Sequence, residues 1–147
     1  MKKLIVVFCV LSAGAFSFWY YTRHPLVTTV TVRDATFTVD VAVTPNEKEV
    51  GLGFRKSLGD DRGMLFVYDH KERYPFWMRA MRFPIDIIWI ADRTIVDISK
   101  NVPVSDKPVE QLPLYHPMVS VDKVLEINAG LSDAYGISIG DSVKIRN

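Results

Sequence analysis

Alternation between apolar and polar residues is the main pattern of the chain after residue 26. Val27–Arg33 and Thr36–Thr44 each alternate with a period of two, which is the repeat of a strand that buries one face. In the second segment, one face carries Phe37, Val39, Val41 and Val43. Because only Asp34 and Ala35 separate the two segments, we expect them to pair as antiparallel strands.

Short apolar segments between turn residues predict further strands. These segments cover residues 64–68, 76–78, 83–91, 94–100, 119–128 and 142–145. Helical signals are fewer: Thr44-Pro45-Asn46-Glu47 has a capping-box spacing that predicts a short helix to about Leu52, and residues 131–135 allow one turn. Four prolines in residues 101–118 indicate a long irregular loop. We expect a mainly β fold, a compact antiparallel β-barrel or β-sandwich with one or two short helices.

Residues 1–22 are typical of a targeting segment. Lys2 and Lys3 precede Leu4–Tyr21, which carries no charge. Cleavage at Ala13-Gly14-Ala15 would make the segment a signal peptide, whereas retention would make it a membrane helix. The aromatic residues at 18–21 favour the retained anchor. We therefore expect a tether at residues 23–26, one β domain at residues 27–147, and a place in the cell envelope, outside the cytoplasmic membrane, or secretion after cleavage.

Charge and cysteine content exclude several classes of function. The formal charge is +1, and it falls to about −1 without Lys2 and Lys3, so no nucleic-acid partner is expected. The lone cysteine, Cys9, lies in the N-terminal segment, which leaves the domain without a disulfide or a thiolate metal site. Met78 and Met81 have a spacing that Cu(I) sites can use, but methionine is the ordinary filler of irregular cores. We predict no metal and no cofactor.

A single acidic residue, Asp86, stands inside the apolar segment 83–91. In a strand it would share a face with Ile88 and Ile90, while Ile87 and Trp89 would point to the other face. An acid among apolar residues needs a partner, because burying an unpaired charge is costly. The candidate partners are Arg55, Arg79 and Arg82.

Glu126 is a second acid within an apolar strand, residues 124–128. The structural interpretation pairs each acid with an arginine. The functional interpretation makes Asp86 and Glu126 an acid/base pair, which requires both carboxyl groups in one open cleft within about 5 to 10 Å.

Several motif blocks occur in a fixed order along the domain. They are Gly51-Leu52-x-x-Arg55, Gly63-Met64-Leu65-Phe66, Phe76-Trp77-Met78-Arg79, residues 83–90, Val124-Leu125-Glu126-x-x-Ala129-Gly130 and Gly136-Ile137-x-x-Gly140-Asp141. This arrangement resembles the DUF192 family (the UPF0127 group of uncharacterised exported proteins) over about residues 30–146. The resemblance implies a compact β-rich domain behind an export signal or anchor, and it implies no established activity. Two departures from the family pattern are Gly53, where many relatives have Met, and Ala80-Met81, which replaces a common Asn-Thr.

Aromatic and charged residues gather in one part of the sequence without a nucleophile–base pair. This composition is typical of a binding site with an aromatic lining. The residues expected to bind a ligand are Arg55, Trp77, Met78, Arg79 and Trp89. The leading hypothesis is a membrane-anchored binding or accessory module of the cell envelope with an unknown small ligand or an envelope protein as partner. The alternatives are an envelope enzyme that uses Asp86 and Glu126, and a structural or interaction protein of an envelope complex.

Overall fold

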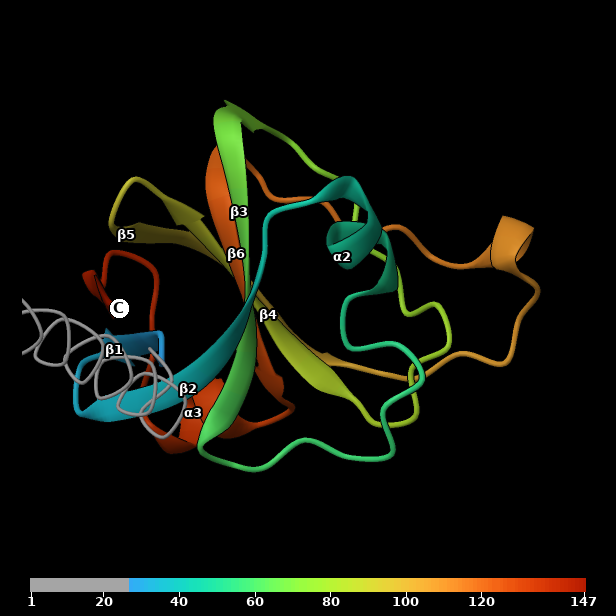
Figure 1. Cartoon of the computed structure of the whole chain (residues 1–147), viewed down its shortest axis with the longest axis horizontal. Helices are drawn as coiled ribbons and strands as arrows, with labels where there is room; N and C mark the ends of the chain where they lie inside the picture. Colours follow the sequence, from blue (N-terminus) through green and yellow to red (C-terminus); the bar gives the residue numbers. More distant parts are fainter. Residues whose placement is uncertain (1–26) are drawn as a thin grey trace, which may run out of the picture.

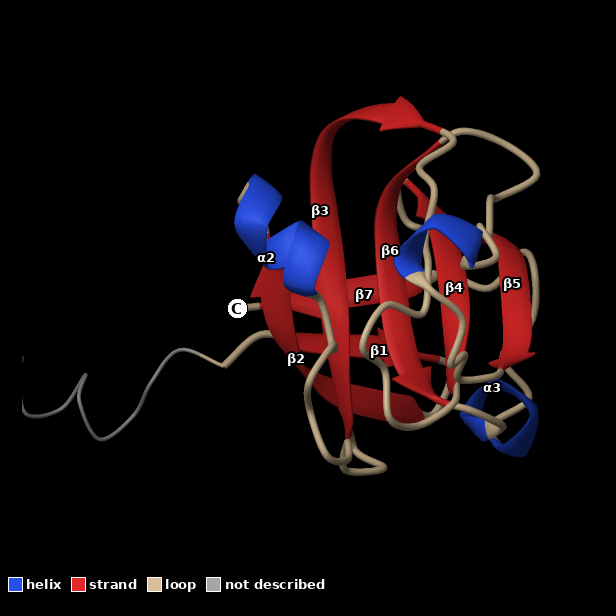
Figure 2. Cartoon of the chain, turned by 90° about the vertical axis from the view of Figure 1, so that its right-hand side faces the viewer, coloured by secondary structure: helices blue, strands red, loops and turns tan. Residues whose placement is uncertain are grey.

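A single curled sheet of seven strands organises the part of the chain that the computed structural model describes, residues 27–147. The strands are β1 (Thr29–Val32), β2 (Ala35–Ala42), β3 (Arg62–Glu72), β4 (Ile85–Ala91), β5 (Thr94–Val102), β6 (Val121–Asn128) and β7 (Val143–Arg146). Their order in the sheet is β5-β4-β6-β3-β2-β1-β7. The sheet forms a half-barrel (Figures 1 and 2), so the expectation of a mainly β fold is confirmed.

The sheet is mostly antiparallel, as expected, and it contains one parallel pair of strands. β2 and β3 run parallel, with Asp40 opposite Met64, while the other neighbouring strands are antiparallel. Parallel neighbours require a crossover connection of about a dozen residues or more. Residues 43–61 supply it, and they include helix α2 (Pro45–Val50).

The two edges of the sheet meet at the turn between β4 and β5. Ile95 N–H donates to Asp141 O at 3.0 Å, and Val143 N–H donates to Arg93 O at 2.8 Å. These bonds join the start of β5 to the start of β7, although the two strands stand at opposite ends of the strand order. The contact holds the sheet in its curled shape.

Each face of the sheet carries its own apolar cluster. The first cluster contains Phe37 and Val39 of β2, Ile88 and Ile90 of β4, and Ile95. The second cluster also takes residues from β4, namely Ile85, Ile87 and Trp89. Its other members include Met64, Phe66, Phe76, Met78 and Val124. The predicted alternation of β4 is therefore confirmed, and the strand is buried from both sides.

The helices are short, as expected. In α2, Glu47 N–H donates to Thr44 Oγ1 and Thr44 N–H donates to Glu47 Oε2, so the predicted capping box is present. A 3₁₀ turn, η1 (Val109–Gln111), interrupts the long loop before β6, and α3 (Leu131–Ala134) follows that strand. Residues 76–78 do not form the expected strand; Phe76 makes only an isolated bridge with Tyr115.

The predicted signal peptide or membrane helix at residues 1–22 and the tether at 23–26 lie outside the described residues. Within residues 27–147, no helix combines the length and the apolar character that crossing a bilayer requires.

Candidate functional site

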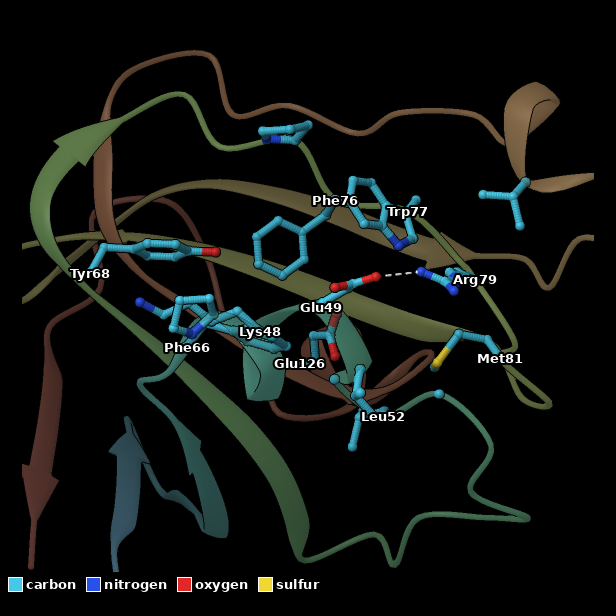
Figure 3. Close-up of a pocket in the computed structure, with 16 residues that line it drawn as sticks. Lys48, Glu49, Leu52, Phe66, Tyr68, Phe76, Trp77, Arg79, Met81 and Glu126 are labelled. Atoms are coloured by element: carbon cyan, nitrogen blue, oxygen red, sulfur yellow. Dashed lines mark hydrogen bonds and ion pairs between the residues drawn. The ribbon is translucent and has the colours of Figure 1, made fainter.

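A pocket of about 480 Å³ opens over the second apolar cluster, between α2, β3 and the segment 75–81 (Figure 3). We call it the Glu126 pocket. Its aromatic lining residues are Phe66, Tyr68, Phe76 and Trp77, and its charged ones are Lys48, Glu49, Arg79 and Glu126. Pro45, Val50, Gly51, Leu52, Gly53, Pro75, Met81 and Val109 complete the lining.

Glu126 comes to this pocket because of its position in the sheet. On β6 it is paired with Met64 of β3 on one side and with Ile87 of β4 on the other. Directly opposite residues share a face of a sheet, so the Glu126 side chain stands between two apolar neighbours. Figure 3 shows its carboxyl group in the middle of the lining residues.

The Glu126 carboxyl has no hydrogen-bond partner among the residues that the structure describes. The residue is only 5% exposed and makes no hydrogen bond or ion pair with residues 27–147. No fully buried side-chain oxygen of these residues lacks a partner, so the Glu126 carboxyl still reaches the solvent in the pocket. Burial raises the pKa of Glu126 to about 8, against an ordinary value of 4.5, because desolvation disfavours the charged form. The positive charge of Arg55 acts in the opposite direction and is the smaller effect.

Asp40, not Glu126, forms the ion pairs of this region. Arg55 Nη1 lies 2.7 Å from Asp40 Oδ2, and Arg62 Nη2 lies 3.3 Å from Asp40 Oδ1. Asp40 stands opposite Met64, in the same cross-strand row as Glu126. The two arginines thus pair with the half-buried acid on β2, and the buried acid on β6 is left facing the pocket.

Aromatic side chains form a connected wall beside the pocket. Phe76 packs edge-on against Phe66, with ring centroids 4.9 Å apart, and against Trp89 at 5.2 Å. Tyr68 stacks on Tyr74, and the ammonium of Lys48 lies 4.2 Å from the Tyr68 ring centroid. Burial raises the pKa of the Tyr68 hydroxyl, and the neighbouring Tyr74 and Glu126 add to this effect.

The rim of the pocket combines an ion pair with exposed apolar groups. Arg79 Nη1 lies 2.7 Å from Glu49 Oε1, and both side chains are largely exposed. Trp77 is 38% exposed and Val109 is 56% exposed. The entrance therefore carries little net charge from Arg79 and Glu49, and it offers apolar surface.

Close backbone contact fixes the loops at the entrance. Phe54 N–H donates to Ala80 O at 2.9 Å, and both residues have positive φ angles, 65° and 55°. A Cβ added to Gly53 would lie 3.0 Å from the carbonyl oxygen of Arg79, so a side chain there would push the loops apart. The loop after α2 and the loop around Ala80 are thus held together as one wall.

Comparison with known proteins identifies the family. The model of DUF192, "Uncharacterized ACR, COG1430", matches residues 28–145. The chain belongs to the DUF192 family. Among solved structures, a protein of unknown function from Novosphingobium aromaticivorans DSM 12444 is 35% identical, with a TM-score of 0.72, over 80% of this chain and 83% of the other. A "putative transcription regulator" from Sinorhizobium meliloti 1021 is 32% identical, with a TM-score of 0.72, over 81% of this chain and 94% of the other. No curated protein matches the chain.

Four of the DUF192 blocks meet at the Glu126 pocket. The block that begins at Gly51 supplies Leu52, and the block that begins at Gly63 supplies Phe66. The block that begins at Phe76 supplies Trp77 and Arg79, and the block that begins at Val124 supplies Glu126. Of the residues expected to bind a ligand, Trp77 and Arg79 therefore line the pocket.

Met78, Trp89 and Arg55 lie elsewhere in this DUF192 domain. Met78 and Trp89 are buried in the second apolar cluster, and Trp89 Nε1–H donates to Ser99 Oγ at 3.0 Å. Arg55 is bound to Asp40 and is not part of the lining. Trp89 is completely buried on the central strand β4, where Phe76 packs edge-on against it.

Asp86 lies on the other face of the sheet and has no arginine partner. Its carboxyl accepts hydrogen bonds from Asn101 N–H at 2.7 Å, Ser132 N–H at 2.9 Å and Ser132 Oγ–H at 2.6 Å. The expectation that Arg55, Arg79 or Arg82 would pair with it is wrong, because its oxygens are saturated by main-chain groups and a hydroxyl. Asp86 thereby ties β4 to the end of β5 and to the start of α3.

Several lining residues of the DUF192 pocket were absent from the sequence-based site. Phe66 and Tyr68 follow Met64 at a period of two, so the strand pattern could have placed them on the Glu126 face. Lys48 and Glu49 carry no comparable signal, since they lie on a short, exposed helix. In residues 27–147, no group of His, Cys, Asp and Glu side chains is arranged to hold a metal ion.

Proposed function

We propose that this DUF192 domain is a small-molecule-binding module and that the Glu126 pocket is its binding site. The observation that carries the proposal is the Glu126 carboxyl, which is buried, faces the pocket and has no partner among the described residues. No side-chain oxygen of residues 27–147 is fully buried without a partner, so the Glu126 carboxyl meets solvent inside the pocket and is open to a ligand. A site that a ligand completes accounts for keeping such a group.

The pocket has the size and the composition of a ligand site. Its volume of about 480 Å³ falls within the range that small-molecule sites occupy, about 300–1,000 Å³. Aromatic and aliphatic side chains supply most of the lining, and a few polar groups are placed among them. Aromatic walls give apolar contact area, while the carboxyl gives orientation and specificity.

We place the module in the cell envelope on the pattern of residues 1–22. Two lysines followed by eighteen uncharged residues suit a retained membrane anchor, with the domain on the outer side of the cytoplasmic membrane. A net charge near zero offers no electrostatic attraction to nucleic acid.

The positions of the two acids favour a binding role over catalysis by Asp86 and Glu126. In the register of β4 and β6, Asp86 is opposite Ile127 and Glu126 is opposite Ile87, which are one position apart on each strand. The two carboxyl groups therefore lie on opposite faces of the sheet. Acid/base catalysis by the pair would need both groups at one substrate.

A thermal-shift screen of the full-length chain in detergent tests the proposal. We expect at least one compound from a panel of small amines, acids, sugars and alcohols to raise the melting temperature, because a ligand of the native state stabilises it. The stabilisation should be lost in Trp77→Ala and Glu126→Leu, and kept in Ile139→Ala, a truncation of an exposed residue outside the pocket. A panel without a stabilising compound, or equal stabilisation of all four proteins, would contradict the proposal.

A further inference from the structure

The chemistry of the pocket floor narrows the class of ligand; the inference rests on the binding function proposed above. Glu126 is the acidic group at the floor, and its cross-strand neighbours, Met64 and Ile87, offer it no hydrogen bond. An ionised carboxyl only accepts hydrogen bonds. The group that would pair with it most strongly is therefore a cationic donor, since charge-assisted hydrogen bonds are about twice as strong as neutral ones.

The aromatic wall suits a cation as well. Phe66, Tyr68, Phe76 and Trp77 line the pocket, and aromatic ring faces attract ammonium groups. The chain itself provides one example, because the ammonium of Lys48 rests 4.2 Å from the centroid of the Tyr68 ring. An aromatic lining together with one carboxyl is the arrangement that proteins use to recognise alkylammonium ligands.

The other charged groups around the pocket do not replace this pairing. At the rim, Arg79 is neutralised by Glu49, and Lys48 is engaged with Tyr68. Arg55 does not line the pocket and is bound to Asp40. Tyr68 is protonated at neutral pH, since the ordinary pKa of a tyrosine is 10 and burial raises the pKa of this hydroxyl further. Glu126 is thus the one acid of the lining that no described cation already occupies.

We propose that the ligand of the Glu126 pocket is a cationic amine, whose ammonium group donates to the Glu126 carboxyl while its apolar body packs along Phe66, Phe76 and Trp77. One carboxyl among apolar groups does not offer the several oxygen ligands that a metal cation needs. An organic cation needs fewer, because its apolar part contributes contact area.

Binding of such an amine is coupled to a proton. With a pKa of about 8, Glu126 is mostly protonated at pH 7 in the empty pocket, and the ammonium binds its ionised form. The proton leaves the carboxyl for the buffer as the amine binds. The ionised fraction rises from about 3% at pH 6.5 to about 90% at pH 9, so the affinity should increase roughly 30-fold over this range.

Isothermal titration of the full-length chain in detergent provides the test. Three probes share a ring and a short chain but differ in charge: 2-phenylethylammonium, 2-phenylethanol and 3-phenylpropionate. We expect the ammonium probe to bind at least tenfold more tightly than the other two at pH 9. Titrations at pH 7 in two buffers of different ionisation enthalpy should show the release of close to one proton.

Two variants locate the effect. Glu126→Gln should remove the preference for the ammonium probe and the proton release, while Glu72→Gln, the same change at an exposed acid outside the pocket, should keep both. If Glu126→Gln does not fold, the pH dependence of the affinity of the wild-type chain for the ammonium probe still tests the amine proposal. Tighter binding of the alcohol or the acid than of the ammonium probe, or an affinity that does not change with pH, overturns the proposal of an amine ligand. The proposed binding function is not affected by that result. No binding by these probes or by any compound of the wider panel overturns both.

Discussion

Asp86 and Glu126 lie on opposite faces of the sheet, although their strands are hydrogen-bonded neighbours. In the register of β4 and β6, Asp86 is opposite Ile127 and Glu126 is opposite Ile87. One acid is saturated with three hydrogen bonds, and the other has none from the described residues. Two acids with the same sequence environment thus have different tasks: Asp86 joins elements of the fold, and Glu126 faces the pocket.

The stability of the protein should fall as the pH rises from about 4.5 to about 8. The pKa of Glu126 is raised in the folded state, so between these values the folded protein holds a proton that the unfolded chain has lost. The stabilisation from that proton is complete below pH 4.5 and is lost as the pH passes through 8. The loss amounts to roughly 4–5 kcal/mol, at 1.36 kcal/mol for each unit of pKa.

Urea unfolding at pH 5, 7 and 9 measures this effect. In Glu126→Gln the corresponding fall should disappear, because the amide does not ionise. If the wild-type chain and the variant keep the same difference in unfolding free energy at all three pH values, the carboxyl is not held protonated by burial.

Asp86→Asn should destabilise the fold by about 2–4 kcal/mol. The amide keeps one acceptor oxygen but places an NH₂ group where Asn101 N–H or Ser132 N–H now donates. Urea unfolding at pH 7 checks the loss, with Glu126→Gln as the matched change on the other face. We expect the Glu126 variant to be at least as stable as the wild-type chain at pH 7, since it leaves no protein donor unpaired and the amide avoids the proton uptake that burial imposes on the carboxyl. Equal losses would show that the three bonds to Asp86 contribute little.

Gly63→Ala should cost about 1–3 kcal/mol because the new methyl group has no space. A Cβ at this position would lie 2.8 Å from the main-chain oxygen of Glu126, between β3 and β6. Gly59→Ala is the control, because the nearest atoms there belong to the flexible side chains of Arg62 and Asp61. The prediction fails if chemical denaturation gives the two variants the same midpoint.

Ala80→Asn should stabilise the protein by about 0.5–1 kcal/mol. Ala80 is exposed and has a φ angle of 55°, a left-handed conformation that asparagine tolerates better than alanine. The positive φ favours the asparagine that the family resemblance implies at this position, and the departure to Ala80 has no structural explanation. Ala80→Val should have the opposite effect, because β-branched residues are strained at positive φ. Melting temperatures in any order other than Asn, Ala, Val from high to low would contradict this prediction.

The strands could be predicted because burial on one or both faces leaves a direct pattern in the sequence. Ile88 and Ile90 lie in the cluster on one face of the sheet, and Ile87 and Trp89 lie in the cluster on the other face, as a period of two requires. The parallel pairing of β2 and β3 could not be predicted in this way, since periodicity carries no information on strand direction. The crossover that contains α2 is visible in the sequence, but the direction of β3 does not follow from it.

The site was predictable only in part, for a physical reason. The partners of Asp86 are two main-chain N–H groups and one hydroxyl, and main-chain donors occur at nearly every residue. Trp77 and Trp89 have similar sequence surroundings, yet the packing of Phe76 buries only the second. Which aromatic residue meets solvent depends on loops that no periodic pattern specifies.

The hydrogen bond between Thr28 Oγ1 and Asn147 Oδ1, at 3.1 Å, brings the start and the end of the described domain together. Both ends lie beside β1, on the side of the molecule away from α2 and the loops that surround the pocket (Figure 1). A fusion partner, an affinity tag or a surface linker can therefore be attached at either end without covering the entrance. The domain can be immobilised through one end while the Glu126 pocket stays open to a flowing sample.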